Sequence, residues 1–364
     1  MTAVHQFVPA LLPRDATGDH TLALRDTLRA AGWESDIYVE AAHDELASEA
    51  TYFERYPERA RPGDILLYQA STASPVADFL VTRPETLVLD YHNITPPSFY
   101  EGWEEHTSEK VALALSQMAR LAPMATLGIA DSTFNASELA GMGCPATAVV
   151  PILVALDADG AAVDAAELVR LQDSHRKGSV LLFVGRLSPN KAQHHLVEAL
   201  WLYRRWYDPA ARLHLVGPAV TASYARAVFA LADELGLADA VRHGEHLTEG
   251  ELAAWYADAD VFVCLSDHEG FCIPLLEAMR AAVPIVAFGA GAVPETLGDA
   301  GLLLDSKRPG VVAAAIDRVR RDPPLAAQLV AAGRRRLGEF SLSRTRARCV
   351  EVRSGLDGGQ VRQP

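Results

Sequence analysis

Short apolar runs alternate with helical stretches along this chain, and this alternation constrains the fold more than any other feature. Apolar runs of three to six residues are typical of strands buried on both faces of a parallel sheet. Two such series occur, one on each side of residues 151–177. The sequence therefore predicts two doubly wound α/β domains. The predicted strands are Val4–Val8, Asp36–Glu40, Asp64–Gln69, Thr86–Asp90, Thr126–Asp131, Thr147–Pro151, Ser179–Val184, Arg212–Val216, Val241–His243, Val261–Leu265, Pro284–Ala287 and Leu302–Leu304.

The length of 364 residues also favours two domains, because it is about twice a common domain size. We expect residues 1–150 and 178–340 to form the two domains, with 151–177 as a junction and 341–364 as a last helix and tail. A polar turn is expected at 157–160, and a helix of the junction is expected to end near His175.

The formal net charge of −14 is unevenly distributed. Residues 1–150 carry 9 Lys and Arg against 21 Asp and Glu, a balance of −12, whereas residues 151–364 carry 24 against 26, a balance of −2. Binding to nucleic acid needs clustered basic residues, so no nucleic acid partner is expected. An anionic membrane surface would repel the acidic first domain, so we expect no membrane association, or only a peripheral one.

The cysteines indicate a reducing compartment. None has the spacing of a metal site, and one lies inside an apolar run. Residues Met1–Ala10 lack the basic and apolar regions of a signal peptide, and no apolar run has the length of a membrane span. We expect a cytoplasmic protein without a bound metal or cofactor. The cysteines are Cys144, Cys264, Cys272 and Cys349.

One strand-to-helix connection in the second series has the features of a phosphate site. The strand Val261–Leu265 is followed by a polar turn and Gly270, and Pro274 suits the first residue of a helix. Free backbone amides at the start of such a helix bind phosphate. Glu269 precedes the helix and Glu277 lies inside it, so both acids are expected to face the crevice at the strand's carboxyl end. The alternative is an ordinary corner with two solvated acids.

A second connection carries two cations. Gly185 permits a sharp turn after the strand, and Arg186 and Lys191 flank that turn. Two cations beside a loop of free amides form a clamp for a diphosphate. The alternative is a pair of solvated surface charges.

Two loops of the first series also follow strand ends, where functional residues concentrate. His92 and Asn93 follow the strand that ends at Asp90, and the alternative for His92 is a structural role. Gly18 lies in the loop after the first strand, where it is expected to form the turn before a helix capped by Asp19. Asp131 or Ser132 is expected to cap a later helix.

Three of these stretches resemble motifs of one family. The segment from Glu269 to Glu277 resembles a Glu-x7-Glu motif, and Gly185 to Lys191 resembles Gly-Arg-x4-Lys. Residues 91–96 read Tyr-His-Asn-Ile-Thr-Pro, like a bacterial branch of the same family. The family is the retaining glycosyltransferases of family 4. The resemblance implies the GT-B fold, in which two Rossmann-like domains face a central cleft and the last helix crosses back to the first domain.

The resemblance also implies roles for individual residues. Arg186 and Lys191 would neutralise the departing diphosphate, Glu269 would bind the hydroxyls of the donor sugar, and Glu277 would bind the ribose. His92 would lie at the reaction centre. The chain departs from the family where Gly18 lacks a second glycine beside it and where Cys272 replaces a common glycine. Further donor-binding residues would be Gly185, Gly270, Phe271, Cys272, Gly18 and Asn93.

These observations predict a hexosyltransferase that is retaining and independent of metal. It would move a sugar from a UDP- or GDP-linked donor to a hydroxyl of a carbohydrate or small-molecule acceptor. The acidic first domain favours a soluble or cationic acceptor over an anionic lipid. The alternatives are another GT-B enzyme, such as an epimerase or a donor hydrolase, and a non-catalytic module that binds sugar nucleotides.

Overall fold

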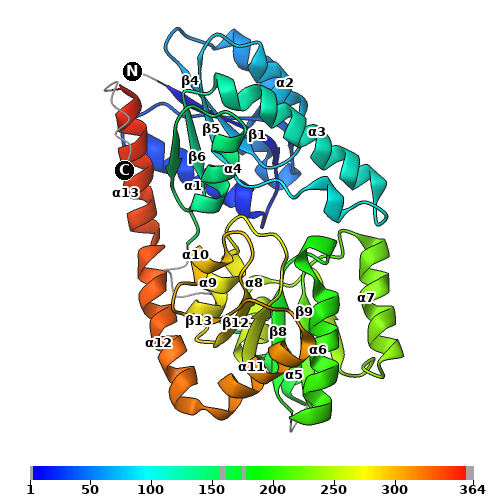
Figure 1. Ribbon diagram of the computed structural model, residues 1–364. Coiled ribbons are helices and arrows are strands. Elements are labelled where there is room, and N and C mark those ends of the chain that lie inside the picture. Colours follow the sequence, from blue (N-terminus) through cyan, green and yellow to red (C-terminus); the bar gives the residue numbers. More distant parts are fainter. Residues whose placement is uncertain (1–2, 156–160, 174–177, 358–364) are drawn as a thin grey trace. The chain divides into compact units, whose positions relative to one another are not determined.

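The computed structural model describes residues 3–155, 161–173 and 178–357. These residues divide into two compact units (Figure 1). Unit 1 comprises the described parts of 1–98, 106–155 and 340–364, and unit 2 comprises those of 99–105 and 156–339. The turn expected at 157–160 and the helix end expected near His175 lie outside the described residues.

Unit 1 is built on a parallel sheet of seven strands in the order β3-β2-β1-β4-β5-β6-β7. Its strands are β1 (Val4–Leu11), β2 (Ile37–Ala42), β3 (Thr51–Tyr52), β4 (Ile65–Ala70), β5 (Thr86–Tyr91), β6 (Leu127–Ala130) and β7 (Thr147–Val149). Its helices are α1 (Ala16–Ala30), α2 (Pro75–Val81), α3 (Glu105–Leu121), α4 (Thr133–Gly141) and α13 (Leu342–Asp357), with short 3-10 helices η1 (Asp44–Glu49), η2 (Phe53–Glu58), η3 (Pro97–Phe99) and η4 (Ala122–Met124).

Side chains alternate between the two faces of this sheet, because successive residues of a strand point in opposite directions. On β4, Leu66 and Tyr68 pack with residues of α2, α3 and α4, whereas Ile65 and Leu67 pack with α1 and α13. Both faces of the sheet are therefore buried under helices, which explains why its strands are mainly apolar.

Unit 2 has a parallel sheet of six strands in the order β10-β9-β8-β11-β12-β13. Its strands are β8 (Val180–Val184), β9 (Arg212–Val216), β10 (Val241–Gly244), β11 (Val261–Cys264), β12 (Ile285–Phe288) and β13 (Gly301–Leu304). Its helices are α5 (Ala165–Asp173), α6 (Gln193–Trp206), α7 (Ala222–Glu234), α8 (Glu249–Asp258), α9 (Ile273–Arg280), α10 (Val293–Leu297), α11 (Pro309–Arg321) and α12 (Pro323–Glu339), with the 3-10 helix η5 (Pro189–Lys191).

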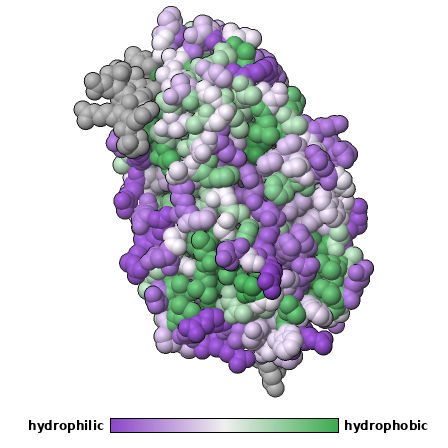
Figure 2. Space-filling view, in the orientation of Figure 1, coloured by the Kyte–Doolittle hydropathy of each residue, from purple (hydrophilic) through white to green (hydrophobic). Residues whose placement is uncertain are grey.

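The core of unit 2 has the same alternation. Helices α6, α7, α11 and α12 cover the face that carries Leu213 and Leu215 of β9. On the opposite face, His214 of β9 packs edge-on against Trp255 of α8, with ring centres 4.8 Å apart. On the side of the chain that Figure 2 shows, hydrophobic residues form patches between hydrophilic ones.

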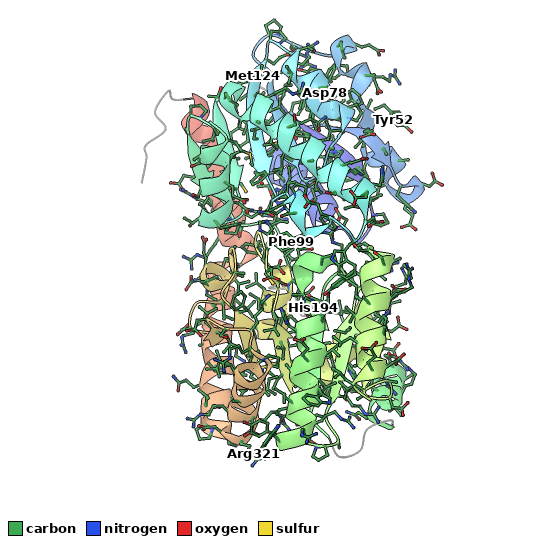
Figure 3. The ribbon with its side chains drawn as sticks, turned by 45° about the vertical axis from the view of Figure 1, so that its right-hand side comes forward. Tyr52, Asp78, Phe99, Met124, His194 and Arg321 are labelled. Carbon is green, nitrogen blue, oxygen red and sulfur yellow. The ribbon has the colours of Figure 1, made fainter. Side chains whose placement is uncertain are left out.

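A short segment of the first half of the sequence belongs to unit 2. In residues 99–105, the Trp103 ring lies edge-on to Tyr224 of α7 at 5.2 Å, and Ser223 Oγ donates a hydrogen bond to the Trp103 carbonyl over 2.6 Å. Phe99 and His194 lie at the end of the unit where α6 begins, and Arg321 lies at the other end (Figure 3).

All twelve predicted strands are confirmed, and β3 is the one strand among the described residues that was not predicted. The predicted start of the first helix is wrong. Helix α1 begins at Ala16, and Asp15 caps it by accepting a hydrogen bond from the amide of Gly18 over 3.0 Å. Gly18 therefore lies in the first turn and not in the loop. A Cβ there would lie 2.7 Å from the Leu12 carbonyl oxygen, so glycine permits a close approach of helix and loop.

Candidate functional site

The carboxyl ends of β8 and β11 form the candidate site of unit 2. β9 pairs with β8 on one side and β11 pairs with it on the other, so the order of strands reverses here. Loops diverge at such a point and leave a crevice in which α/β proteins bind ligands. Arg186 and Lys191 follow β8, and Glu269 and Glu277 follow β11.

Backbone contacts fix the two loops to one another. The amide of Asp267 donates to the carbonyl of Asn190 over 2.8 Å, which joins the loop after β11 to the loop after β8. Gly185 has φ of 151°, and a Cβ on Gly217 would lie 2.5 Å from the Gly185 carbonyl oxygen. Glycine is thus required at the turn that brings the cations to the crevice.

Lys191 and Glu269 form an ion pair, although 78 residues separate them in the sequence. Lys191 Nζ lies 2.7 Å from Glu269 Oε2, and the two side chains are 17% and 7% exposed. Burial alone would lower the pKa of Lys191, but the carboxylate of Glu269 outweighs it and raises that pKa. The structure therefore brings two predicted site residues into direct contact.

A third loop fixes the backbone of Glu269. Gly291 has φ of 55°, and a Cβ there would lie 2.3 Å from the Glu269 carbonyl oxygen. The amide of Ala292 donates to that same oxygen over 2.9 Å. The close approach requires a glycine, which explains the Gly-rich sequence at this point.

The start of α9 follows directly after Glu269. Cys272 precedes the helix with φ of 69° and ψ of 63°, a left-handed conformation. Thr296 Oγ1 donates to the Phe271 carbonyl over 2.6 Å and holds the turn in place. Pro274 lies in the first turn of the helix, as predicted. Gly270 is half-buried.

Glu277 lies one turn into α9 and is half-buried. Tyr256 of α8 donates its hydroxyl hydrogen to Glu277 Oε2 over 2.8 Å. Burial raises the pKa of Glu277. The hydrogen bond leaves a second carboxylate oxygen that can accept from a ligand hydroxyl.

Arg186 differs from Lys191 in being exposed. Its carbonyl accepts a hydrogen bond from Gln193 Nε2 over 2.9 Å, which fixes the backbone while the guanidinium extends into solvent.

Lys307, which no motif indicated, adds a further cation at the same edge of the sheet. It pairs with Asp267 and donates to the Leu265 carbonyl over 3.4 Å. Its ammonium also lies 5.1 Å from the centre of the Phe288 ring.

In unit 1, His92 lies in a buried cluster at the carboxyl ends of β4, β5 and β6. Its side chain is 4% exposed, and its Nδ1 lies 3.0 Å from Asp131 Oδ2. Burial alone would lower the pKa of His92, but the carboxylates of Asp131 and Asp90 outweigh it and raise that pKa to about 9. Asp131 thus pairs with His92, and Ser132 caps α4 by accepting from the amide of Asn135.

A chain of hydrogen bonds fixes the second nitrogen of His92. Gln6 donates to the Thr21 carbonyl over 2.9 Å, and its oxygen accepts from Gln69 Nε2 over 2.8 Å. The oxygen of Gln69 therefore faces His92 Nε2, 2.5 Å away. Both ring nitrogens of His92 donate, so the ring is an imidazolium.

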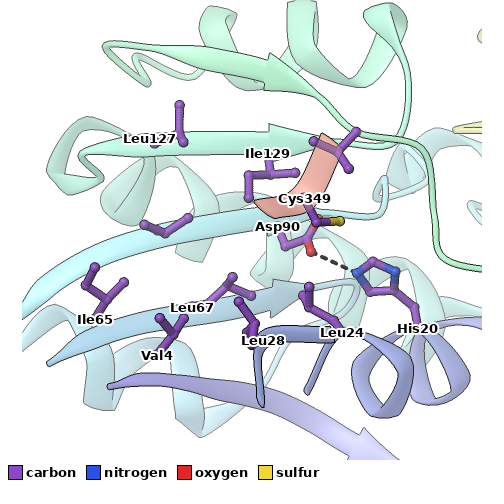
Figure 4. A pocket seen from close by; sticks show the side chains of 12 residues that line it. Val4, His20, Leu24, Leu28, Ile65, Leu67, Asp90, Leu127, Ile129 and Cys349 are labelled. Carbon is purple, nitrogen blue, oxygen red and sulfur yellow. Dashed lines mark hydrogen bonds and ion pairs between the residues drawn. The ribbon is translucent and has the colours of Figure 1, made fainter. Parts of the chain in front are cut away.

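His20 joins this cluster from α1. The amide of Leu153 donates to its Nδ1 over 2.9 Å, so its Nε2 carries the hydrogen and donates to Asp90 Oδ2 over 3.0 Å. Figure 4 shows this pair beside a small, mostly apolar cavity that Cys349 of α13 also lines. No sequence motif indicated His20, which reaches Asp90 across 70 residues of sequence.

The structure also places the other residues predicted for the first series. Asn93 has φ of 72°, and its amide donates to Asn135 Oδ1 over 2.9 Å and to Glu138 Oε2 over 2.8 Å. Gly18 lies in α1, two residues from His20. Their predicted contacts with a donor stay predictions.

Two groups of side chains among the described residues bring together atoms that metals favour. In one group, of His20, Asp90 and His92, each ring nitrogen already has a hydrogen-bond partner. The other group is formed by Cys264, Glu269 and Cys272.

Comparisons with known proteins show similarity to glycosyltransferases. Residues 168–336 match the family model described as "Glycosyl transferases group 1", so unit 2 contains a domain of that family. The chain is 35% identical over 188 residues to a D-inositol 3-phosphate glycosyltransferase of Thermomonospora curvata, which covers 50% of this chain and 43% of that protein. It is 32% identical over 237 residues to a GDP-mannose-dependent alpha-(1-6)-phosphatidylinositol monomannoside mannosyltransferase of Mycolicibacterium smegmatis, covering 62% and 61%. The chain thus matches about half the length of these curated relatives.

Solved structures extend the similarity over both units. The Anabaena protein Alr3699/HepE, in complex with UDP and glucose, has a TM-score of 0.73 at 19% identity and covers 97% of this chain and 100% of its own. Sucrose-phosphate synthase of Thermosynechococcus elongatus has a TM-score of 0.76 at 18% identity, covering 99% and 100%. The predicted family resemblance and the two Rossmann-like domains of the GT-B class are confirmed. None of the described helices has both the length and the apolar composition of a membrane span.

Proposed function

We propose that this chain is a retaining glycosyltransferase that needs no metal. It moves a sugar from a UDP- or GDP-linked donor to a hydroxyl of a carbohydrate or small-molecule acceptor. The contact between Lys191 and Glu269 at the reversal of strand order carries this proposal, because it brings a cationic and an acidic side chain together at the same point. Two of the similar proteins support a UDP- or GDP-linked donor. One relative is named as GDP-mannose-dependent, and one similar structure was solved in complex with UDP.

The donor diphosphate would lie between the loop after β8 and the start of α9. Lys191 has three N–H donors, so it can bind a phosphate oxygen while it keeps Glu269. Arg186 and the amides from Gly270 to Cys272 would add to this stabilisation as negative charge develops on the departing diphosphate. Preorganised donors of this kind each contribute about 3 kcal/mol to lowering a barrier. The cations would thus replace a metal ion.

Two glutamates would position the rest of the donor. Glu269 is oriented by its ion pair with Lys191 and can accept from hydroxyls of the sugar. Glu277, oriented by Tyr256, would accept from the hydroxyls of the ribose. The new glycosidic bond would form on the face from which the diphosphate leaves, and the acceptor proton would pass to an oxygen of that diphosphate.

Residues of unit 1 complete the proposal. His92 would lie at the sugar and contribute its positive charge, because both its nitrogens are already held by Asp131 and Gln69. Asn93 and Gly18 would lie near the donor or acceptor. We also propose a cytoplasmic location, which four free cysteines support.

Calorimetric titration of the metal-free protein with UDP, GDP and ADP tests the donor site. Tight binding of one nucleotide is expected. If the folded protein bound none of them, the clamp and the enzyme would both be refuted. Turnover with the matching sugar nucleotides then separates the alternatives, because an epimerase or hydrolase yields no glycoside and a binding module yields no product. The anomeric configuration of the product, read by NMR, tests retention.

Glu269→Gln is expected to reduce transfer about 100- to 1,000-fold, the usual effect of removing one preorganised polar group. Affinity for the nucleoside diphosphate should stay within about threefold, since Lys191 and the amides remain. The matched control is Glu234→Gln on the exposed surface of α7, which should change neither quantity. Unchanged turnover in Glu269→Gln would remove Glu269 from the site.

A further inference from the structure

Two thiols and a carboxylate meet in unit 2 beside the proposed phosphate turn. Cys264 ends β11, Cys272 precedes α9, and their sulfur atoms lie 3.9 Å apart. One ligand atom from each of Cys264, Cys272 and Glu269 lies within 4.8 Å of the others. All three residues are buried, with 1%, 7% and 6% of their surface exposed. The cysteines are eight positions apart in the sequence, a spacing that gave no metal signal.

The distance between the sulfur atoms fits a shared metal ion. Zinc binds thiolates tetrahedrally at about 2.3 Å, which places two sulfur ligands about 3.8 Å apart. A disulfide needs a separation of about 2.0 Å, so the sulfur atoms would have to approach by almost half their distance. The thiols are thus already spaced as two ligands of one ion.

The charges around the group also balance. Two thiolates and one carboxylate around a divalent cation carry one net negative charge. Lys191, 2.7 Å from Glu269, supplies the compensating positive charge. Burial of charged groups costs less free energy when opposite charges lie next to them, as they would here. The hydroxyl of Ser266 lies 3.5 Å from the sulfur of Cys264. It is placed either to hydrogen-bond a water molecule that serves as the fourth ligand or to bind the metal ion itself.

We propose that Cys264, Cys272 and Glu269 form a binding site for a thiophilic divalent cation such as Zn²⁺. Two metal–sulfur bonds and one metal–oxygen bond form, and the two thiol protons pass to solvent, so no oxidant or reductant is needed. Thiolate ligands select zinc and its heavier relatives over Mg²⁺ or Mn²⁺.

The cation acts as an inhibitor of the site and not as its cofactor. This consequence rests on the function proposed above. Coordination occupies Glu269, which would otherwise accept from the donor sugar. It also draws Cys272 toward the ion and with it the turn whose amides face the phosphate. Chelation of the cation restores the site.

Titration of the reduced protein with Cd²⁺ tests the site without any measurement of activity. Cadmium–thiolate bonds give a charge-transfer absorption in the ultraviolet, and a large excess of Zn²⁺ should compete for the site and reduce it. One ion per chain is expected. Loss of an outer partner already costs about 10- to 100-fold in metal affinity, so Cys264→Ala or Cys272→Gly should cost at least about 100-fold. Glycine suits the left-handed conformation at 272, so the second variant keeps the fold even if the first does not.

Cys144→Ala and Cys349→Ala are the matched controls, because both cysteines are buried and lie in unit 1. They should bind Cd²⁺ like the unchanged protein. Absence of the absorption, or its persistence in both Cys264→Ala and Cys272→Gly, would overturn the proposal. Zn²⁺ should also weaken nucleotide binding in the unchanged protein at least about tenfold, and not in Cys264→Ala. If the metal-free protein binds no nucleotide, the proposed function fails while the metal site is still decided by the absorption.

Discussion

Both units bring a basic side chain and a carboxylate together at the carboxyl ends of their strands, but they hold these pairs differently. In unit 1, each nitrogen of His92 has a partner, and one of these partners, Gln69, is itself fixed by a further glutamine, Gln6. In unit 2, Lys191 has three N–H donors and one carboxylate partner at 2.7 Å, on a loop beside a crevice. The first pair is fixed by its surroundings, whereas the second keeps donors that can bind a ligand. Similar charges thus favour stability in one unit and binding in the other.

The largest expected effect comes from breaking the fixed pair. Asp131→Asn removes the negative charge beside a buried imidazolium, and loss of one partner of a buried pair costs about 3 to 5 kcal/mol of unfolding free energy. Chemical denaturation followed by circular dichroism measures it. The control is Asp26→Asn, whose side chain is 60% exposed beside Arg25, where the loss should be below about 0.5 kcal/mol. Equal losses in both variants would contradict the comparison.

The pH dependence of stability gives the next effect. The pKa of His92 is about 9 in the folded protein against an ordinary value of 6.5, so folding favours the protonated ring. The protonated His92 ring adds about 3 kcal/mol to the free energy of unfolding. This stabilisation is fully present below pH 6.5 and is lost as the pH rises through 9.

The matched variant for this pH dependence is His92→Gln. The difference in unfolding free energy between the unchanged protein and the variant should shrink steadily above about pH 7. A difference that stayed constant up to about pH 10 would show that His92 is not charged. Lys191 should contribute no such slope, because its pKa is raised above an ordinary value of 10.5.

The smallest expected effect comes from the pair of Lys191 and Glu269, in which Lys191 can also bind a ligand. Lys191→Met should weaken binding of UDP or GDP about 10- to 100-fold, since a charged hydrogen bond contributes about 1.5 to 3 kcal/mol. Binding of the corresponding nucleoside should not change, which serves as the internal control. Its cost in stability should be smaller than that of Asp131→Asn, because the side chain of Lys191 is 17% exposed and water can reach the pair. Equal weakening for nucleotide and nucleoside would place Lys191 away from the diphosphate.

The fold was largely predictable from the sequence, because a strand buried on both faces is mainly apolar and each such run is a local signal. Strand β3 was missed because two residues, Thr51 and Tyr52, give no run to detect. The start of α1 was misplaced because Asp15 and Asp19 both suit a helix cap, and the closeness of Gly18 to Leu12 decides between them.

The candidate site was only partly predictable. Motifs indicated Lys191 and Glu269 separately, but their contact depends on β8 and β11 being neighbours, which local patterns do not encode. The same holds for His20 and Asp90, which meet across the sheet of unit 1. Lys307 carried no motif and reaches the site only because β13 ends at the same edge of the sheet.

The position of α13 has a consequence for the order in which the chain folds during synthesis. Cys349 of this helix fills the core of unit 1 together with Val4 and Leu24, which the ribosome makes first. Unit 2 consists almost entirely of residues made in between. The ribosome therefore releases the residues of unit 2 before it makes those that close the core of unit 1. The first unit to begin is the last to finish, and until α13 emerges the sheet face that α1 and α13 share is covered only in part.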